Sequence, residues 1–175
     1  LFISTHNFEF FNLLREIKPV ANKAGARLFL IRRIAEKFST LEDMPASLAR
    51  NQSEYHFLFE VIYRFHSAPD KTNHEVLMLL PNAMRRFIEL YTYSRLPGPK
   101  DSEQVDERAE NLFGVERAKR ILKIFHYFSH GNTLDRLAGN NELIFDLEHA
   151  VKDLLDAITE TDRPHMDALI AATKA

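Results

Sequence analysis

Residue types that can cleave RNA without a metal ion recur at helical spacing in this sequence. Arg85 and Glu89 are four residues apart in NAMRRFIE, and His126 and His130 are four apart in RILKIFHYFSH. Residues at i and i+4 lie next to each other on one face of a helix. Glutamate and histidine can act as general base and acid on a ribose 2′-hydroxyl and the leaving 5′-oxygen, while arginine holds the phosphate. These four residues are therefore candidates for a ribonuclease site, in competition with ordinary surface ion pairs and packed histidines.

Further basic residues could hold an RNA backbone near this candidate site. Arg86 lies three residues before Glu89, and Arg120 and Lys123 share one side of the helix expected at 115–128. Cations along a helix attract phosphates, although a solvated charged face is the commoner meaning of such a pattern. The histidines at 126 and 130 have the spacing of two zinc ligands, but the sequence offers no third ligand in a zinc motif. We therefore expect no metal site.

The beginning of the sequence, LFISTHN, indicates a short buried strand over residues 1–5 that ends at His6. A helix is expected from Phe8 to about Val20, and a second strand from Arg27 to about Ile34. A histidine at the exit of a buried strand is well placed to contact a phosphate, whereas a helix-capping histidine is the structural alternative. Two strands do not form a stable sheet alone, so residues 1–36 are expected to be the C-terminal remnant of a larger α/β domain.

The stretch FISTHNFEFF resembles the switch-histidine strand of ABC-type ATPases of the SMC/RecF kind. It is most similar to the ATPase class of the PrrC and RloC anticodon nucleases and related bacterial defence proteins. This resemblance implies that His6 senses the γ-phosphate of a nucleotide in the full-length protein. The sequence contains no G-x-x-x-x-G-K-[ST] phosphate loop and no apolar strand ending in Asp-Glu, so this chain alone is not expected to act as an ATPase. ATP and Mg²⁺ would bind in an N-terminal ATPase head outside the chain, and no cofactor is expected in the chain itself.

The remainder of the sequence is organised as a connector followed by helices. Residues 37–51 read as a polar connector, and residues 52–175 show helical periodicity throughout. One helix is expected at about 52–67, and one or two helices over residues 73–96, where Pro81 is expected to restart or kink the chain. Further helices are expected at about 103–111, 115–128, 142–159 and from Pro164 onward. The predicted fold class is mainly α, with a short N-terminal β-α-β remnant of an ABC ATPase core followed by an all-helical domain.

Three stretches of the helical part, SEYHFLFEVIYRF, LLPNAMRRFIELY and ILKIFHYFSHGN, resemble the region after the switch histidine in the PrrC/RloC-like class. Nuclease domains of that class use an Arg-x-x-x-Glu pair and a later histidine, and are similar to HEPN RNases. The resemblance implies catalytic roles for Arg85 and Glu89 with His130 or His126; His130 is favoured because Ser-His follows an aromatic-rich helix. The usual HEPN Arg-x4–6-His spacing is met instead by Arg120 and His126, which is a competing assignment.

The composition of the sequence limits the partners, cofactor sites and functions that we expect. A formal charge of −2 gives no global basic field for nucleic acid, and the absence of cysteine excludes disulfides and thiolate metal sites. The apolar runs are too short to span a bilayer, so we expect a cytoplasmic protein with no membrane partner. The leading hypothesis is a metal-independent RNase, with tRNA as one candidate substrate, within an antiphage defence ATPase. The alternative is a non-catalytic helical module that packs on the ATPase head or on a partner protein, and a homodimer is left open.

Overall fold

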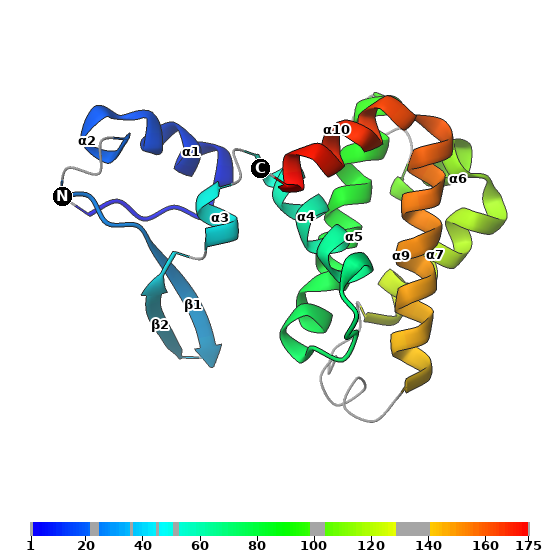
Figure 1. Cartoon of the computed structure of the whole chain (residues 1–175), viewed down its shortest axis with the longest axis horizontal. Coiled ribbons are helices and arrows are strands. Elements are labelled where there is room, and N and C mark those ends of the chain that lie inside the picture. The colour runs from blue at the N-terminus through cyan, green and yellow to red at the C-terminus, as the bar shows by residue number, and fades with distance from the viewer. Residues whose placement is uncertain are drawn as a thin grey trace. The chain divides into compact units, whose positions relative to one another are not determined.

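The computed structural model describes residues 2–21, 25–35, 37–44, 46–50, 53–98, 104–128 and 141–174 (Figure 1). The chain divides into two compact units, Leu1–Phe57 and Leu58–Ala175. The fold is mostly helical, with a small two-stranded sheet followed by helices, which confirms the predicted fold class. The boundaries of the three predicted segments, 1–36, 37–51 and 52–175, stay a prediction.

The first unit begins with an extended segment and a capped helix. Helix α1 (Phe8–Glu16) starts at Asn7, whose side-chain oxygen accepts a hydrogen bond of 2.9 Å from the Phe10 amide. The Asn7 amide in turn donates to the Thr5 hydroxyl at 3.0 Å. Helix α1 ends at Glu16 and is followed by the short α2 (Lys18–Ala21), where one helix to about Val20 was expected. Pro19 has no amide hydrogen to continue the ladder of α1, which accounts for the break.

The sheet is a hairpin of two neighbouring strands. Strand β1 (Phe29–Ala35) pairs antiparallel with β2 (Phe38–Asp43), and Ile31 lies opposite Leu41 in the register. The strand expected at 27–34 is therefore present, but the strand expected at 1–5 is wrong, because described residues 2–5 form no strand. The expected connector contains β2 and helix α3 (Ala46–Arg50). The β-α-β order is thus replaced by a helix before a hairpin, since β1 finds its partner in the segment that follows it.

The second unit is a cluster of helices. Helix α4 (Glu54–Ser67) crosses from the first unit into the second, and α5 (His74–Arg95) follows it. The other helices are α6 (Val105–Phe113), α7 (Val115–Phe128), α9 (Asn141–Thr161) and α10 (Arg163–Lys174). Helix α6 packs against α5, α7 and α9, while α7 also contacts α5 and α9, and α10 contacts α9. These bounds lie within about three residues of the expected ones.

Helix α5 runs through Pro81 without interruption, so of the two expected outcomes the restart is wrong and the kink stays a prediction. Proline in a helix interior removes one backbone hydrogen bond and costs about 3 kcal/mol when nothing compensates for it. Here Pro81 is buried, and its neighbours Leu77, Leu80 and Met84 are almost completely inaccessible. Burial of this helix face against the rest of the unit therefore offsets the missing hydrogen bond.

A chain of aromatic rings lies along the centre of the second unit. Phe59 of α4 is 5.8 Å from Phe87 of α5, measured between ring centroids, and Phe87 is 6.2 Å from Tyr91. Tyr91 then stacks on Phe113 of α6 at 5.9 Å, and its hydroxyl lies 3.1 Å from the Thr161 hydroxyl of α9. Offset ring pairs at these separations stabilise a core beyond their buried area. These four rings are thus part of the core of the second unit.

Candidate functional site

The predicted catalytic pair lies on the solvent-facing side of α5. Arg85 Nε is 3.1 Å from Glu89 Oε1, and Arg86 Nη1 is 3.4 Å from Glu89 Oε2. The two arginine side chains are about half exposed, and Glu89 is less so. Core residues Phe87 and Ile88 occupy the opposite side of the same helix. The spacing therefore predicted the Arg85–Glu89 contact correctly. Arg85, Glu89 and Arg86 form a small ion-pair network on the exposed face of the helix, which we call the α5 triad.

The chemistry open to this triad is limited by its own charges. One carboxylate faces two guanidinium groups, so the triad keeps a single excess positive charge at neutral pH. A phosphate could contact the outer nitrogen atoms of both arginines only by replacing Glu89 at some of these contacts. Surface ion pairs of this kind stabilise a helix by a few tenths of a kcal/mol, about 0.2–0.5. The geometry is compatible with a phosphate contact and also with an ordinary stabilising pair.

The two candidate histidines fall in a part of the chain where side chains are not described. His130 lies outside the described residues, and for His126 only the backbone, in helix α7, is described. The expected meeting of Arg85 and Glu89 with either histidine therefore stays a prediction. The competing pair, Arg120 and His126, occupies helix positions six residues apart, which lie about 120° from each other around the helix axis.

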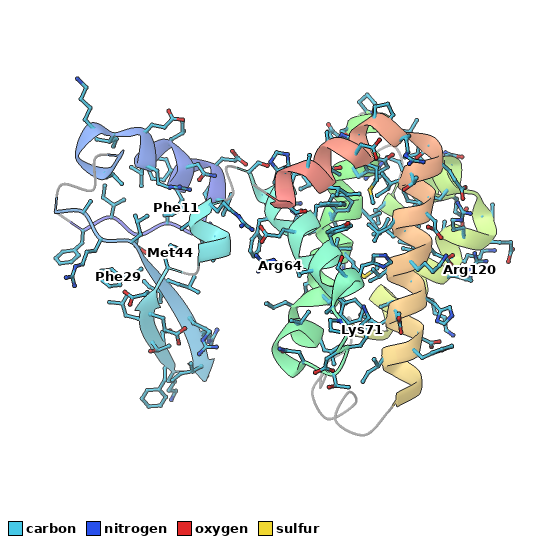
Figure 2. The ribbon with its side chains drawn as sticks, in the orientation of Figure 1. Phe11, Phe29, Met44, Arg64, Lys71 and Arg120 are labelled. Atoms are coloured by element: carbon cyan, nitrogen blue, oxygen red, sulfur yellow. The ribbon has the colours of Figure 1, made fainter. Side chains whose placement is uncertain are left out.

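The basic side of α7 is matched by an acidic side of α9. Arg120 Nε donates to Asp153 Oδ2 at 2.7 Å, and Arg117 donates to both carboxylate oxygens of Glu160 at 2.6 and 3.1 Å. These hydrogen bonds raise the pKa of both guanidinium groups, and the Arg117 contact lowers the pKa of the Glu160 carboxyl. Arg120, labelled in Figure 2, thus belongs to an interhelical ion pair.

Two of the three residues predicted to bind RNA are already engaged in ion pairs within the protein. Arg86 is bound to Glu89 and Arg120 to Asp153, while Lys123 is exposed on α7. The acidic partners on α9 were not recognised in the sequence. Asp153 and Glu160 are seven residues apart, which is two helical turns and the spacing expected of one helix face. The same spacing would have indicated an acidic face, but only the packing of α7 on α9 identifies its partner.

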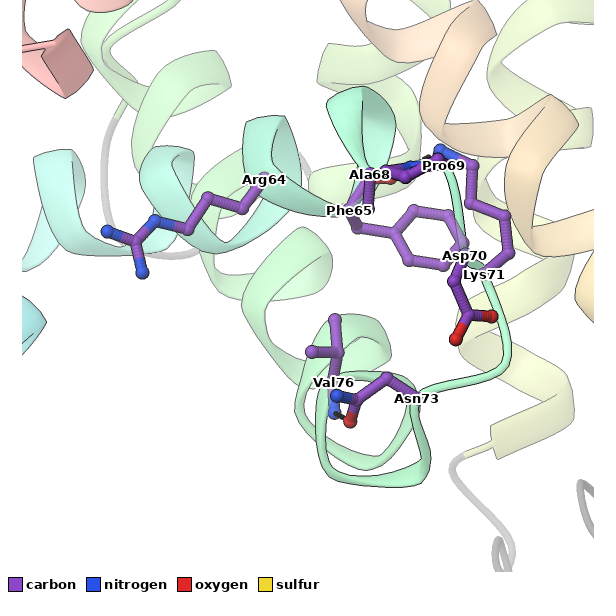
Figure 3. A pocket seen from close by; sticks show the side chains of 8 residues that line it. All are labelled: Arg64, Phe65, Ala68, Pro69, Asp70, Lys71, Asn73 and Val76. Atoms are coloured by element: carbon purple, nitrogen blue, oxygen red, sulfur yellow. Dashed lines mark hydrogen bonds between the residues drawn. The ribbon is translucent and has the colours of Figure 1, made fainter.

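A shallow pocket of about 230 Å³ lies at the turn from α4 to α5 (Figure 3). Its lining residues are Arg64, Phe65, Ala68, Pro69, Asp70, Lys71, Asn73 and Val76. The Lys71 ammonium group donates to the carbonyl oxygens of Phe65 and His66, the latter at 2.7 Å, and lies 5.0 Å from the centre of the Phe65 ring. A cation at the C-terminal end of a helix satisfies carbonyls that have no partner in the helix.

The other polar residues of this turn are also engaged. Asp70 accepts hydrogen bonds from the hydroxyl and the amide of Thr72, at 2.6 and 2.8 Å, and these bonds lower the pKa of its carboxyl. Arg64, whose side chain extends away from the Phe65 ring in Figure 3, pairs at 2.6 Å with the buried Glu60. The sequence SAPDKTNH indicated a turn but not this pocket. Its charged groups serve the turn, so we do not assign a ligand to it.

His6 lies in the exposed segment before α1. The described residues contain no group of three metal-ligating side chains, and none of their helices is both long enough and apolar enough to cross a membrane. Because the sequence also has no phosphate loop, the residues present do not form a site for ATP and Mg²⁺. The nucleotide-sensing role expected for His6 stays a prediction.

Apolar side chains on two surfaces of the first unit are exposed. On α1, Phe10 and Leu13 lie at helical spacing, Ile17 comes directly after the last residue of the helix, and all three are about half exposed. On the hairpin, Phe29, Ile31 and Leu41 lie on one face, because Ile31 and Leu41 are directly opposite and Phe29 is two residues from Ile31. In the described part of residues 2–57 no side chain is fully buried. We call these two surfaces the α1 stripe and the hairpin face.

The comparison with protein families identifies what these two units belong to. A family model described as an AAA domain matches residues 1–156, which is most of the chain. The chain therefore belongs to the AAA-domain family, and its expected relation to AAA/ABC-type ATPases is confirmed at this level. No curated protein and no solved structure matches the chain.

Proposed function

We propose that this chain is a non-catalytic interaction and regulatory part of an AAA/ABC-type ATPase. In this proposal the first unit packs through the α1 stripe and the hairpin face against the rest of the nucleotide-binding domain. The helical unit is the module through which the ATPase contacts or controls its effector. The observation that carries the proposal is the exposure of both apolar surfaces in a unit that, in its described part, has no fully buried side chain.

The exposed area supports a large contact. Six apolar side chains, each about half exposed, correspond to roughly 600 Å² of apolar surface if each side chain contributes about 200 Å² when fully exposed. A stable interface buries about 800 Å² on each partner, so the two surfaces together approach the size of one such interface. A two-stranded hairpin is also only marginally stable without further strands or a packed helix. The exposed apolar area and the marginal stability of the hairpin both favour binding of this unit to another protein surface.

The occupant we propose is the part of the ATPase domain that contains the phosphate loop. Membership in the AAA-domain family implies a nucleotide site, and this sequence lacks the loop that such a site needs. The loop would come from the same polypeptide, if this chain is the C-terminal part of a longer one, or from a second subunit. In the assembled domain His6 would contact the γ-phosphate, as its resemblance to a switch histidine implies.

The ion pairs of the helical unit favour this proposal over catalysis. A cationic groove for RNA needs charges that are available to phosphates. Arg85, Arg86 and Arg120 instead contact Glu89 and Asp153, in the manner of surface pairs that stabilise helices.

The test is co-purification of the 175-residue chain with the part of the ATPase that contains the phosphate loop, followed by a measurement of ATP hydrolysis. The double variant Ile31→Asp with Leu41→Asp places two charges on the hairpin face and should abolish both association and hydrolysis, because buried unpaired carboxylates are strongly unfavourable. The variant Ser39→Asp adds a charge on the same face near its end and should have a smaller effect. Undiminished association of the double variant would refute the proposed contact.

A second candidate function is the metal-independent RNase of the PrrC/RloC-like, HEPN-containing class. It is favoured by one observation, namely that Arg85 and Glu89 are in contact on a solvent-accessible helix face. In this scheme Arg85 holds the scissile phosphate, Glu89 acts as the base, and His130 or His126 acts as the acid. The ATPase would then gate cleavage, with tRNA as one candidate substrate.

Cleavage of RNA by the full-length ATPase in the presence of ATP tests this candidate. Glu89→Ala and His130→Ala should each lower the cleavage rate by about 10²-fold or more if these residues are the base and the acid. Lys152→Ala is a matched control, because it also breaks an exposed i,i+4 ion pair, with Asp156, but on helix α9. Equal cleavage by the wild type and all three variants would remove this site from consideration.

A further inference from the structure

Phe145 is a large aromatic side chain on the solvent side of helix α9. Its exposed fraction is 60%, and its ring centroid lies 4.0 Å from that of His149, one turn further along the helix. Residues nine apart lie on opposite sides of a helix, and Leu154, nine residues after Phe145, is fully buried. Phe145 therefore lies on the side of α9 directly opposite the core, and not at the border of its apolar face.

The carboxylates on either side of Phe145 differ from those further along α9. In the second half of this helix three carboxylates are matched by cations, in the pairs Arg120–Asp153, Lys152–Asp156 and Arg117–Glu160. Asp146 and Glu148 are exposed, and neither side chain has an ion pair among the described residues. Helix geometry places them about 100° and 60° from Phe145, on opposite sides of it. We call Phe145, Asp146, Glu148 and His149 the α9 surface.

The chemistry of the α9 surface favours a cationic partner. The face of an exposed aromatic ring attracts a cation, and this cation is more often arginine than lysine. Carboxylates bind a guanidinium group through two parallel hydrogen bonds, a geometry that the ammonium group of lysine does not offer. The same carboxylates repel the phosphates of nucleic acids and anionic lipids. The α9 surface is thus complementary in charge to an arginine-rich protein segment.

We propose that the α9 surface is a docking site for an arginine-rich segment of another protein. One guanidinium group lies over the Phe145 ring, and neighbouring cations of the segment contact Asp146 and Glu148. In the proposed function, on which this docking site rests, the segment belongs to the effector that the helical unit contacts. Aromatic and arginine side chains are enriched at protein interfaces, and complementary charges at such a contact raise the rate of encounter.

The experiment measures the fluorescence anisotropy of labelled oligo-arginine, oligo-lysine and oligo-glutamate peptides of about ten residues, titrated with the 175-residue chain. Oligo-arginine should bind more tightly than oligo-lysine, and oligo-glutamate should not bind. Phe145→Ala should weaken oligo-arginine binding by about two- to five-fold and reduce its advantage over oligo-lysine, because the ring is lost. Glu148→Gln should also weaken this binding and reduce its dependence on salt.

Two substitutions elsewhere in the helical unit are matched controls. Leu79→Ala truncates a side chain that is 58% exposed on α5. Glu107→Gln neutralises an exposed carboxylate on α6 that has no ion pair among the described residues. Both should leave the affinity for oligo-arginine unchanged, because neither residue belongs to the α9 surface. Circular dichroism spectra that match the wild type establish that each variant is folded.

Absence of oligo-arginine binding by the wild type, or equal weakening by Glu148→Gln and Glu107→Gln, would overturn the docking site. Binding of labelled oligo(dT) that Phe145→Ala abolishes would assign the ring to nucleic acid instead. Phe145→Ala should still co-purify with the part of the ATPase that contains the phosphate loop, because the α1 stripe and the hairpin face make that contact. A wild type that co-purifies in this way but binds no oligo-arginine would therefore overturn the docking site and leave the ATPase contact standing.

Discussion

The two units of this protein use similar amphipathic sequences with opposite results. On α7 the apolar residues Ala118, Ile121 and Leu122 are all at most 5% exposed. By contrast, the α1 stripe, made of Phe10 and Leu13 on the helix and Ile17 directly after it, is about half exposed. Every fully buried side chain among the described residues lies in the second unit. The comparison indicates that the helical unit supplies its own core, and that the apolar pattern of the first unit is complementary to a surface from elsewhere.

The largest expected difference between the units is in the cost of removing an apolar side chain. Phe87→Ala deletes a ring that contacts Phe59 and Tyr91 and should lower the free energy of unfolding by about 3–5 kcal/mol. Ile31→Ala on the hairpin face should lower it by less than about 1 kcal/mol, because that side chain is already exposed. Urea unfolding of the 175-residue chain, followed by far-ultraviolet circular dichroism, measures both. Similar costs for the two variants would mean that the hairpin face is buried in the free chain.

The next largest effect on the free energy of unfolding is expected from substitution of Asp162, between α9 and α10. Asp162 accepts a hydrogen bond of 3.1 Å from the His165 amide at the start of α10, and its carboxylate also pairs with Arg95 of α5. Asp162→Ala should lower the free energy of unfolding by about 1–2 kcal/mol through loss of the helix cap. Asp162→Asn retains the capping oxygen and should recover most of this loss. If the Asn variant is as unstable as the Ala variant, the ion pair with Arg95 is the larger contribution.

Two glycines with a positive φ, one in each unit, allow a comparison of the units. Gly114, after the last residue of α6, has φ of 83°, and Gly25 in the first unit has φ of 76°; neither has an atom that a new Cβ would strike. Gly114 also has ψ of 147°, a combination that is essentially restricted to glycine, so alanine there is strained by about 1 kcal/mol or more. Gly114→Ala should therefore shift the unfolding midpoint of the helical unit, and Gly25→Ala should leave it unchanged. A shift with Gly25→Ala would show that the two units unfold together.

The smallest expected effect concerns the ion pairs between α7 and α9. Hydrogen bonds from Arg117 lower the pKa of the Glu160 carboxyl in the folded protein. The stabilisation from this shift is complete above the ordinary glutamate pKa and is lost as the pH falls through the lowered value. Wild type should therefore be slightly more stable than Glu160→Gln at pH 7, and the difference should vanish in acid and shrink in high salt.

Denaturant unfolding at several pH values measures this difference. Glu148→Gln, which neutralises an exposed carboxylate on the same helix, is the control for the change in net charge. A difference that persists at low pH would show that Glu160 stabilises the unit by something other than its charge.

The helices and some of their surface contacts could be predicted from local sequence. Periodic apolar residues located α4, α5, α6, α7 and α9 to within about three residues, because a period of 3.6 is a property of the chain itself. The contact of Arg85 with Glu89 was predictable for the same reason, since i and i+4 neighbours meet on any helix. Strand β2 was missed because FSTLED, half exposed and polar, lacks the apolar content of a buried strand.

The partners of distant residues could not be predicted in this way. Arg120 was expected to face a phosphate or a histidine, and its guanidinium instead meets Asp153, which is 33 residues further along the chain. Continuation of α5 through Pro81 likewise depends on burial against other helices. Residues 2–5 read as a strand but form none, since a strand exists only where another strand pairs with it.

By itself, then, the sequence determined the helical class, the helix positions, the local ion pairs on α5 and the lack of a phosphate loop, all of which depend on residues close to one another in the chain. Only the tertiary structure decided which amphipathic faces are buried and which charges are matched by a neighbouring helix. It buries the apolar side of α7 and leaves the α1 stripe exposed, although both have the same local periodicity. The physical reason is that burial and ion pairing require a second surface, and local sequence does not specify where that surface lies.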